Sequence, residues 1–411
     1  MTARLEPVGQ RSETVRRANL SAIVRELHAG GPLSRSELVA RTGLTRSAIR
    51  GLIGELTAAG LAGETRAIPL GTPGRPSPLV RPEPERAVVL ALEIAVDSLA
   101  AALVGLGGTV LASIRVDRPR DHVSLDAIVA DLVGLSERVL VPSRRRSAVI
   151  GVGVAVAGIV RRTDGFVWMA PNLGWRDIPL GERLDAALGL GVPLEVANDA
   201  DLGALAEVRR GAARGVDHVL YISGEVGVGG GIIVGGRALA GVAGYGGEIG
   251  HMPVNPDGRA CGCGSTGCWE TEIGATALLR RAGRPTDGGR SEVDALLAAA
   301  TDGDPVSLAA LEETGRWLGL GLAGLVNVLN TGLVVFGGLF EHLYPFIERP
   351  AQAVLDERAL RPPRDLVGLA PSALGGDAPL LGAAELAFEP LLADPARWLR
   401  PRDTLLERAS A

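Results

Sequence analysis

At 411 residues the chain is long enough for two or three domains and a sizeable core. Hydrophobic residues make up 46% of it but aromatic residues only 3%, so we expect a core of Ala, Val, Leu and Ile. Lysine is absent, which excludes a phosphate-binding loop that depends on lysine. Residues 1–82 hold twelve Arg against six Glu, a net of +6, which leaves −11 for the remainder of a chain of net charge −5. A basic head on an acidic body predicts nucleic-acid contact confined to the head.

Apolar residues of the head recur with the spacing of α-helices. A first helix carries four of them on one face: Leu20, Ile23, Val24 and Leu27. Ser34 followed by Glu37 is the pattern of a capping box and predicts the start of a second helix. After a short turn around Gly43, Thr45 caps a third helix. That helix repeats the apolar spacing with Ile49, Leu52, Ile53 and Leu56. A short turn containing Gly between two helices is typical of a helix-turn-helix unit.

The outer face of the third helix is polar and basic near its N-terminus, where it carries Thr45, Arg46, Ser47 and Arg50. We predict that these four residues contact DNA, because this end reaches base edges when such a helix enters the major groove. Residues 61–70 suit a strand pair, and a Gly- and Pro-rich loop follows them. This loop predicts a wing with Arg75 at its tip, where the arginine would contact a DNA phosphate or the minor groove. A three-helix protein-interaction domain is the alternative for residues 1–82. The Pro-rich, charged stretch 81–85 is expected to be a linker.

The body, residues 83–411, alternates apolar strands with helices. Two βββαβα-like halves in tandem predict a two-lobed α/β protein with a cleft between the lobes. The first half has expected strands at residues 88–94, 99–105 and 109–116, a helix at 125–141 and a strand at 148–156. The second has expected strands at 219–223 and 228–234, a short one after Gly235-Gly236, and another at 333–336.

Nothing in the chain predicts secretion or membrane insertion. The first 19 residues are polar and charged, unlike a signal peptide. Residues 318–340 lack charges and have the length of a membrane span, but they contain Asn327, Asn330 and six glycines. A buried helix, an Asn-Thr-Gly turn and a buried strand explain them better. We expect a cytoplasmic protein without a membrane partner, and reduced cysteines agree with that compartment.

All three cysteines, Cys261, Cys263 and Cys268, lie within the glycine-rich segment 248–272, and His251 precedes them by ten positions. Three thiolates and one imidazole form a closed tetrahedral ligand set, which predicts a structural Zn²⁺ ion with no open position for catalysis. The alternative is a surface loop whose reduced cysteines bind no metal.

The order Gly-Glu-x-Gly-His, then Cys-x-Cys-Gly-x-x-Gly-Cys-x-Glu, resembles the zinc-binding segment of the ROK family of repressors, open reading frames and sugar kinases. The resemblance covers nearly the whole body. It implies an actin-like (ribonuclease H-like, sugar-kinase) α/β body in two lobes, preceded by an α+β winged helix-turn-helix head. The expected domains are therefore 1–82 and 83–411.

In the Val-Ala-Asn-Asp-Ala segment, local chemistry makes Asn198 or Asp199 an adequate helix N-cap. The resemblance adds that both residues hold a sugar, with Asp199 as the catalytic base if the protein is a kinase. It also assigns sugar contacts to Asn172, Glu248, His251 and Glu270. Carboxylates and amides suit a polyol, because each hydroxyl group needs both a donor and an acceptor.

The expected phosphate-binding segments depart from the kinase pattern. The first Asp-x-Gly-Gly-Thr turn of the family kinases is replaced by residues 93–97, Glu-Ile-Ala-Val-Asp, whose side chains hinder close backbone approach. In the second, a Gly-rich loop, Glu225 and Val226 replace a glycine and a threonine. Phosphoryl transfer depends on positioning and neutralising phosphates, so we do not expect ATP, Mg²⁺ or kinase activity.

The sequence thus predicts a sugar-responsive transcription regulator that binds a double-stranded DNA operator and a small sugar or sugar derivative. The resemblance to the family's repressors implies that it represses genes of carbohydrate metabolism. Family precedent implies a homodimer or a dimer of dimers. Two alternatives stay open: an active ATP-dependent sugar kinase with a fused DNA-binding head, and an interaction scaffold that binds no small molecule.

Overall fold

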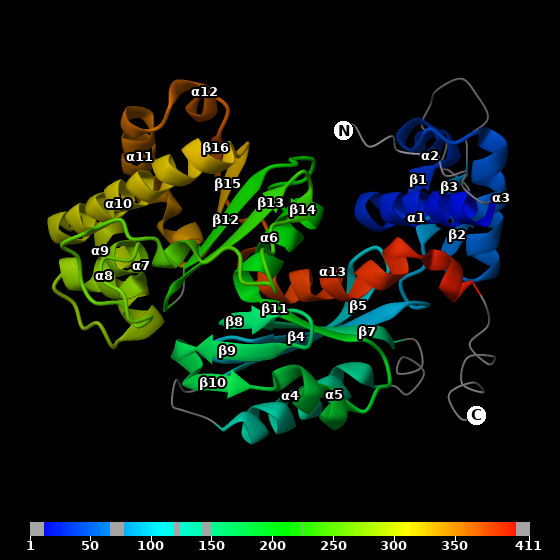
Figure 1. Ribbon diagram of the computed structural model, residues 1–411, viewed down its shortest axis with the longest axis horizontal. Coiled ribbons are helices and arrows are strands. Elements are labelled where there is room, and N and C mark those ends of the chain that lie inside the picture. Colours follow the sequence, from blue (N-terminus) through cyan, green and yellow to red (C-terminus); the bar gives the residue numbers. More distant parts are fainter. Residues whose placement is uncertain (1–11, 66–77, 119–123, 142–148, 225, 400–411) are drawn as a thin grey trace, which may run out of the picture.

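The computed structural model describes residues 12–65, 78–118, 124–141, 149–224 and 226–399 (Figure 1). It consists of a small N-terminal head and a body of two lobes. Figure 1 shows the head beside the first lobe, with the second lobe on the far side of the body. Arg75, Glu225 and the tail after residue 399 lie outside the described residues.

The head contains three helices and a small antiparallel sheet of order β1-β3-β2. Its elements are α1 (Ser12–Gly30), β1 (Leu33–Ser34), α2 (Arg35–Thr42), α3 (Arg46–Ala58), β2 (Ala62–Thr65) and β3 (Leu79–Pro82). The predicted capping box is confirmed, since Ser34 and Glu37 bond each other's backbone reciprocally. Thr45 caps α3, and Gly43 ends α2 in the left-handed conformation at φ 69°.

Two details of the head differ from the sequence prediction. The strand pair expected within residues 61–70 is formed instead by β2 and the more distant β3, in register from Ala62↔Pro82 to Thr65↔Leu79. The expected linker was therefore wrong at Arg81 and Pro82, which belong to β3. A proline is tolerated at this strand end because it need not donate a ladder hydrogen bond there.

The first lobe is built on a mixed sheet of order β11-β7-β4-β5-β6. Its strands are β4 (Val88–Ile94), β5 (Ser98–Gly105), β6 (Thr109–Asp117), β7 (Val149–Val156) and β11 (Leu194–Asn198). Helices α4 (Leu125–Leu140) and α5 (Leu180–Leu188) cover one face (Figure 1). A three-stranded sheet of order β10-β9-β8, not predicted from the sequence, is formed by β8 (Ile159–Arg161), β9 (Phe166–Ala170) and β10 (Trp175–Ile178).

The second lobe is built on a sheet of order β14-β13-β12-β15-β16. Its strands are β12 (Val219–Gly224), β13 (Val228–Val234), β14 (Arg237–Ala238), β15 (Leu333–Gly338) and β16 (Gly368–Pro371). The lobe's helices are α7 (Glu270–Ile273), α8 (Ala275–Arg281), α9 (Gly289–Thr301), α10 (Pro305–Leu329), α11 (Leu339–Arg358) and α12 (Arg361–Arg364). The prediction for residues 318–340 is confirmed, because α10 ends at Asn330 (φ 49°) and β15 follows. Among the described residues, no helix is long and apolar enough to cross a membrane.

Two helices join the lobes by packing on each other. Helix α6 (Asp199–Arg210) follows the last strand of the first lobe but packs on β12 and β13 of the second. Helix α13 (Ala378–Ala393) follows β16 of the second lobe but packs on β4 and β7 of the first. The contact is close where a Cβ added to Gly382 would meet the carbonyl oxygen of Leu202 at 1.9 Å, so only glycine fits there.

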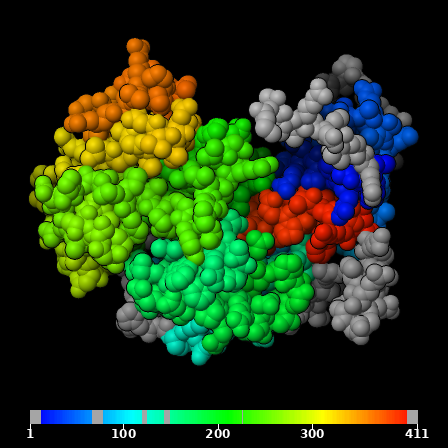
Figure 2. All heavy atoms as spheres, viewed as in Figure 1, coloured from blue at the N-terminus to red at the C-terminus, as the bar shows by residue number. Residues whose placement is uncertain are grey.

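Among the residues that the structure describes, the head has no hydrophobic core separate from that of the body. Residues of α1, α2 and α3 form one continuous buried cluster with β4, β5 and α13 of the body. Phe388 of α13 is fully buried in this cluster, and its ring lies 4.8 Å from that of His28 on α1. Figure 2 shows the red atoms of this C-terminal region between the blue head and the body.

Candidate functional site

A cavity of about 260 Å³ opens between the two lobes. All six predicted sugar-contacting residues line it: Asn172, Asn198, Asp199, Glu248, His251 and Glu270. They come from four separate segments of the chain, so the tertiary structure brings together what the sequence only grouped by resemblance. Apolar wall residues such as Ile159 and Met169 were not anticipated, because isolated apolar side chains carry no sequence signal for a site.

The first turn of α6 supplies two of these polar groups. Asn198 is the N-cap, since its Oδ1 accepts the backbone N–H groups of Ala200 (2.8 Å) and Asp201 (3.2 Å). Its Nδ2 donates to the carbonyl oxygen of Gly158 at 3.0 Å, which fixes the amide orientation. The capping role left open between Asn198 and Asp199 therefore belongs to Asn198. Asp199 accepts the N–H of Ala200 (2.9 Å) and also lines the cavity.

Asn172 and Glu270 converge on Gly227 from the two lobes. Asn172 lies in the 3₁₀ turn Pro171–Leu173, and Glu270 begins α7. A Cβ added to Gly227 would lie 3.0 Å from Glu270 Oε2 and 3.5 Å from Asn172 Nδ2. Glu270 Oε2 also accepts the N–H of Val228 at 3.3 Å. The glycine leaves both polar groups room within the cavity.

Three carboxyl groups lie around the first turn of α6, of which Asp201 is buried, Asp199 half-buried and Glu248 exposed. Desolvation raises the pKa of Asp199 and of Glu248 above their usual values. Burial also raises the pKa of Asp201 to about 7, although the positive charge of Arg162 opposes the shift. Sequence reasoning missed Asp201; its only signal was a second acidic residue two positions after Asp199. Such a cluster of desolvated acids favours ligands that offer hydroxyl groups over anions.

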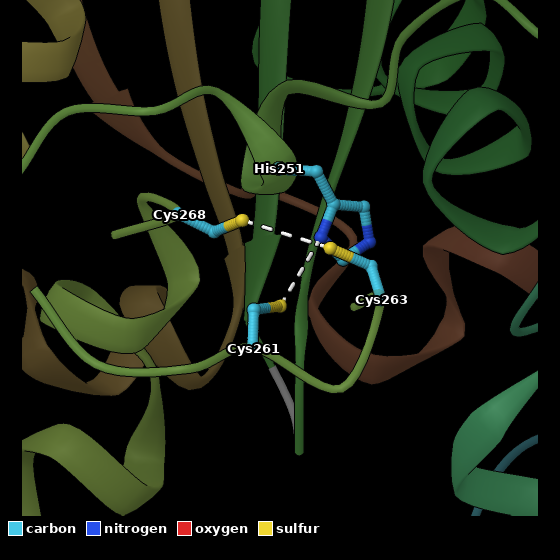
Figure 3. A group of neighbouring side chains, drawn as sticks. All are labelled: His251, Cys261, Cys263 and Cys268. Carbon is cyan, nitrogen blue, oxygen red and sulfur yellow. Dashed lines mark hydrogen bonds between the residues drawn. The ribbon is translucent and has the colours of Figure 1, made fainter. Parts of the chain in front are cut away.

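The four predicted metal ligands lie together beside this cavity (Figure 3). Their ligand atoms are all within 4.8 Å of one another, with 3.6 Å from Cys261 Sγ to His251 Nδ1 and 3.7 Å from Cys263 Sγ to Cys268 Sγ. Any two thiolates bound to a tetrahedral zinc ion lie roughly 3.8 Å apart, because each Zn–S bond measures about 2.3 Å. The donor set and its spacing therefore fit a tetrahedral metal ion.

Gly267 allows the backbone of residues 248–272 to bring the four predicted ligands together. Gly267 has φ 71°, and a Cβ there would lie 1.7 Å from the carbonyl oxygen of Asn255. Because His251 faces the cysteines with Nδ1, its Nε2 is left for other partners, and His251 also lines the cavity. The metal-ligand cluster and the polar cavity thus share two residues, His251 and Cys263.

The expected phosphate-binding segments have other contacts here. The β4–β5 turn is closed by a hydrogen bond from Ala95 N to Ser98 O (3.0 Å). Glu93 is buried and binds Arg115 at 2.9 Å; burial nevertheless raises the pKa of Glu93 to about 7. In the second segment, a Cβ at Gly231 would lie 2.4 Å from Ala200 O, so this glycine is required for packing α6 on β13.

Val226 lies between the polar cavity and a smaller cavity of about 110 Å³, and it lines both of them. Asp97 and Arg290 line the smaller cavity.

The predicted DNA-contacting residues of α3 lie on one exposed surface. Thr45, Arg46, Ser47 and Arg50 are all exposed, while Ile49 between them is fully buried. The Thr45 hydroxyl, besides capping α3, lies 3.1 Å from the Ser47 hydroxyl. Arg75 belongs to the residues that the structure does not describe, so the structure does not place it relative to this surface.

The body has two lobes that are joined by helices around a polar cleft, which is the architecture of an actin-like sugar-kinase fold. The head is a winged helix-turn-helix, a class of domain that binds DNA. A match to the ROK family extends over residues 89–389, and the chain belongs to this family. A ROK family transcriptional regulator, described as a homologue of the E. coli MLC protein, superimposes with a TM-score of 0.74 at 27% identity, covering 94% of this chain and 97% of that one.

Relatives named as repressors and relatives named as glucokinases align with this chain over different lengths. The xylose repressor of Bacillus subtilis is 27% identical over 382 residues, covering 92% of this chain and 97% of the repressor. The glucokinase of Streptomyces coelicolor is 33% identical over 325 residues, covering 74% of this chain and 98% of the kinase. The Streptomyces griseus glucokinase structure, with glucose and AMPPNP, covers 73% of this chain at 32% identity and a TM-score of 0.63. The repressor alignment is longer than the body and must include part of the head.

Proposed function

We propose that this protein is a sugar-responsive transcription regulator whose body binds a small sugar or sugar derivative and whose head binds an operator. The observation that carries the proposal is the presence, in one chain, of a complete polar cleft and an intact helix-turn-helix surface. The relatives that cover more than nine-tenths of this chain are named as repressors or regulators, whereas the glucokinase alignment covers 74% of it. Repression relieved by the sugar is the direction we expect.

In this proposal the Cys261, Cys263, Cys268 and His251 set holds a structural Zn²⁺ ion. A four-coordinate zinc ion supplies rigidity rather than catalysis. His251 Nε2 and the neighbouring carboxylate of Glu270 would then face the sugar in fixed positions, with Asn172, Asn198, Asp199 and Glu248 completing the contacts.

Closure of the lobes around the sugar would change the position of the head relative to a second copy. A homodimer, or a dimer of dimers, would place two α3 helices on paired half-sites, and their spacing would decide affinity. Coupling of this kind is a difference in DNA affinity between the sugar-bound and sugar-free states.

The test is fluorescence anisotropy of the full chain on DNA from upstream of its own and neighbouring genes, without ATP. D-xylose, D-glucose and N-acetylglucosamine form the first panel, with D-sorbitol as a control for nonspecific polyol effects. Specific DNA binding that one sugar weakens, with an unchanged affinity for random DNA, supports the proposal. DNA binding that no sugar alters would remove the sensor role from the body and leave only the head's role.

An ATP-dependent sugar kinase is the second candidate, and the body's 33% identity to a glucokinase favours it. The replacement of the phosphate-contacting residues by Ala95, Val96 and Val226 opposes it, because these side chains hinder close backbone approach to a phosphate and Val226 offers no hydroxyl donor. Sugar-dependent ADP formation that Asp199→Asn abolishes would establish the kinase. An ADP yield equal to that of a no-sugar control would exclude it.

A further inference from the structure

Helix α6 makes polar contacts along its whole length with three different parts of the molecule. Its N-terminal residue Asp199 and its cap Asn198 line the cavity. A helix of 12 residues measures about 18 Å, since each residue contributes about 1.5 Å. Its C-terminal end lies against α1 of the head. One rigid element thus extends from the proposed sugar site to the head.

The third turn of α6 is hydrogen-bonded to the segment that connects β16 of the second lobe to α13. Glu207 is fully buried and accepts hydrogen bonds from the Ser372 hydroxyl (2.5 Å) and from the N–H groups of Ala373 and Leu374 (3.1 Å each). These three residues follow β16 and lead into α13. Because a buried carboxylate that loses such partners is costly, α6 and this connection must move together.

The last residue of α6, Arg210, binds the head directly. Its Nη1 donates to the carbonyl oxygens of Gly107 (3.0 Å) and His28 (3.4 Å), and its Nε donates to Glu385. His28 and Glu385 are each only 2% exposed and lie 3.0 Å apart. The N–H of Gly107 donates to His28 Nδ1 (3.0 Å), while His28 Nε2 lies 2.8 Å from Arg210 Nη2 and 3.0 Å from Glu385 Oε2.

This cluster joins α6, α13 and α1 in a buried position. A Cβ added to Gly108 would lie 2.0 Å from Arg210 Cζ, so the guanidinium group fills the space beside the β5–β6 turn. A second, more exposed bridge runs alongside, in which Glu389 of α13 accepts both Arg25 of α1 and Arg209 of α6 at 2.9 Å. Buried charges tolerate little displacement of their partners, so movement of α6 is passed to α1.

We propose that Arg210 is the positioning residue that couples the sugar cleft to the head, by fixing α1 to the far end of the helix whose first turn contacts the sugar. The proposal rests on the proposed function in one respect, namely that DNA affinity is the output. Arg210 contacts neither sugar nor DNA in this scheme. It transmits the displacement of α6 that lobe closure produces.

The ligand-dependent test compares wild type, Arg210→Met and the control Arg316→Met, whose arginine pairs with Glu312 on the exposed face of α10. D-xylose and D-glucose are the probes. We expect Arg210→Met to keep the wild-type sugar Kd within about threefold while the sugar-induced change in DNA Kd falls by about tenfold, the scale of typical allosteric coupling. Retention of the wild-type DNA response in Arg210→Met would overturn the proposal. Arg210→Gln, which keeps a hydrogen-bond donor, replaces Arg210→Met if the latter does not fold.

A ligand-free test separates this proposal from the proposed function. Asn198→Ala removes the α6 cap and the bond to Gly158 at the cleft end. We expect Asn198→Ala to accelerate amide hydrogen exchange at residues 20–31 of the head severalfold in the wild-type background. In the Arg210→Met background, Asn198→Ala should cause no further acceleration of this exchange. Exchange in the head that ignores Asn198→Ala would overturn the coupling even if the protein binds sugar and DNA. If neither sugar binds, the proposed effectors fail while this exchange measurement still decides the coupling.

Discussion

The two acidic residues in the first turn of α6 have different surroundings. Asp199 lines the cavity beside Asn198, whereas Asp201 is only 7% exposed and faces Arg162 and Glu248. Burial raises the pKa of both carboxyl groups. Two substitutions of equal size, Asp to Asn, therefore separate a ligand-contacting role from an electrostatic one.

For Asp199→Asn we expect a weaker sugar response, because the amide cannot accept from a sugar hydroxyl with the strength of a carboxylate. DNA affinity without sugar should stay within about twofold of wild type, since the side chain is remote from α3. Anisotropy titrations with and without sugar measure both quantities. Asp294→Asn on the surface of α9 is the control. A collapse of DNA binding itself would mean that Asp199 has a structural role instead.

For Asp201→Asn we expect a gain in stability that depends on pH. The pKa of Asp201 in the folded protein, about 7, lies above its ordinary value of 3.8. The contribution of this group to stability is therefore fully present below about pH 3.8 and is lost as the pH rises through 7. The asparagine avoids this loss, so the free energy of unfolding should exceed that of wild type by up to about 4 kcal/mol at pH 8. Urea denaturation at pH 8 and pH 5 measures the difference, which should shrink at pH 5; an equal effect at both would contradict the assignment.

At the scale of single elements, α3 combines a buried apolar face with exposed arginines. We expect Arg50→Ala to weaken specific DNA binding by about 1–3 kcal/mol if Arg50 contacts a base edge, and Arg46→Ala to reduce the salt dependence by about one unit if Arg46 contacts phosphate. Anisotropy at several salt concentrations distinguishes the two contacts. Arg316→Ala on α10 serves as the control. Wild-type affinity in both α3 variants would favour the protein-interaction alternative for the head.

If the four predicted ligands hold Zn²⁺ as proposed, at one ion per chain, residues 248–272 depend on that ion for local order. Cys263→Ser removes one of the four ligands, so we expect metal content to fall from one ion per chain to a fraction of one. The stabilisation by bound sugar should be lost with it, while the affinity of the head for DNA is kept. Mass spectrometry of metals and thermal unfolding with sugar measure these effects. Thr266→Ala, an exposed position in the same segment, should change neither, and full metal content in Cys263→Ser would refute the ligand set.

At the scale of the whole molecule, the head shares a hydrophobic core with the first lobe and α13. We therefore expect Phe388→Ala, a fully buried position on α13, to destabilise the head and first lobe together by about 3–5 kcal/mol. Hydrogen exchange should accelerate in α1, β4 and β7 at once. Phe336→Ala, equally buried but in the second lobe, should leave α1 protected. Loss of protection in α1 alone would show that the head is an independent folding unit.

Much of the secondary structure follows from local features of the sequence. The strand 88–94 and the caps at Ser34 and Thr45 were predicted correctly, because a short run of apolar residues and a capping pattern both depend on neighbours a few residues apart. The β8–β10 sheet and β3 were missed. Their strands are short, and β3 pairs with β1 across more than forty residues of intervening chain, which no local pattern encodes.

The sequence by itself determined which candidate ligand groups the chain offers: three cysteines and one histidine in one segment, and the amides and carboxylates that the family resemblance assigns to a sugar. These depend on residue identity and short spacing. Only the tertiary structure decided that the six polar residues share one cavity, and that α6 and α13 each pack on the sheet of the other lobe. It also decided that His28 meets Glu385, 357 positions away. Contacts between such distant residues form because the whole chain buries its apolar surface at once, which local sequence does not specify.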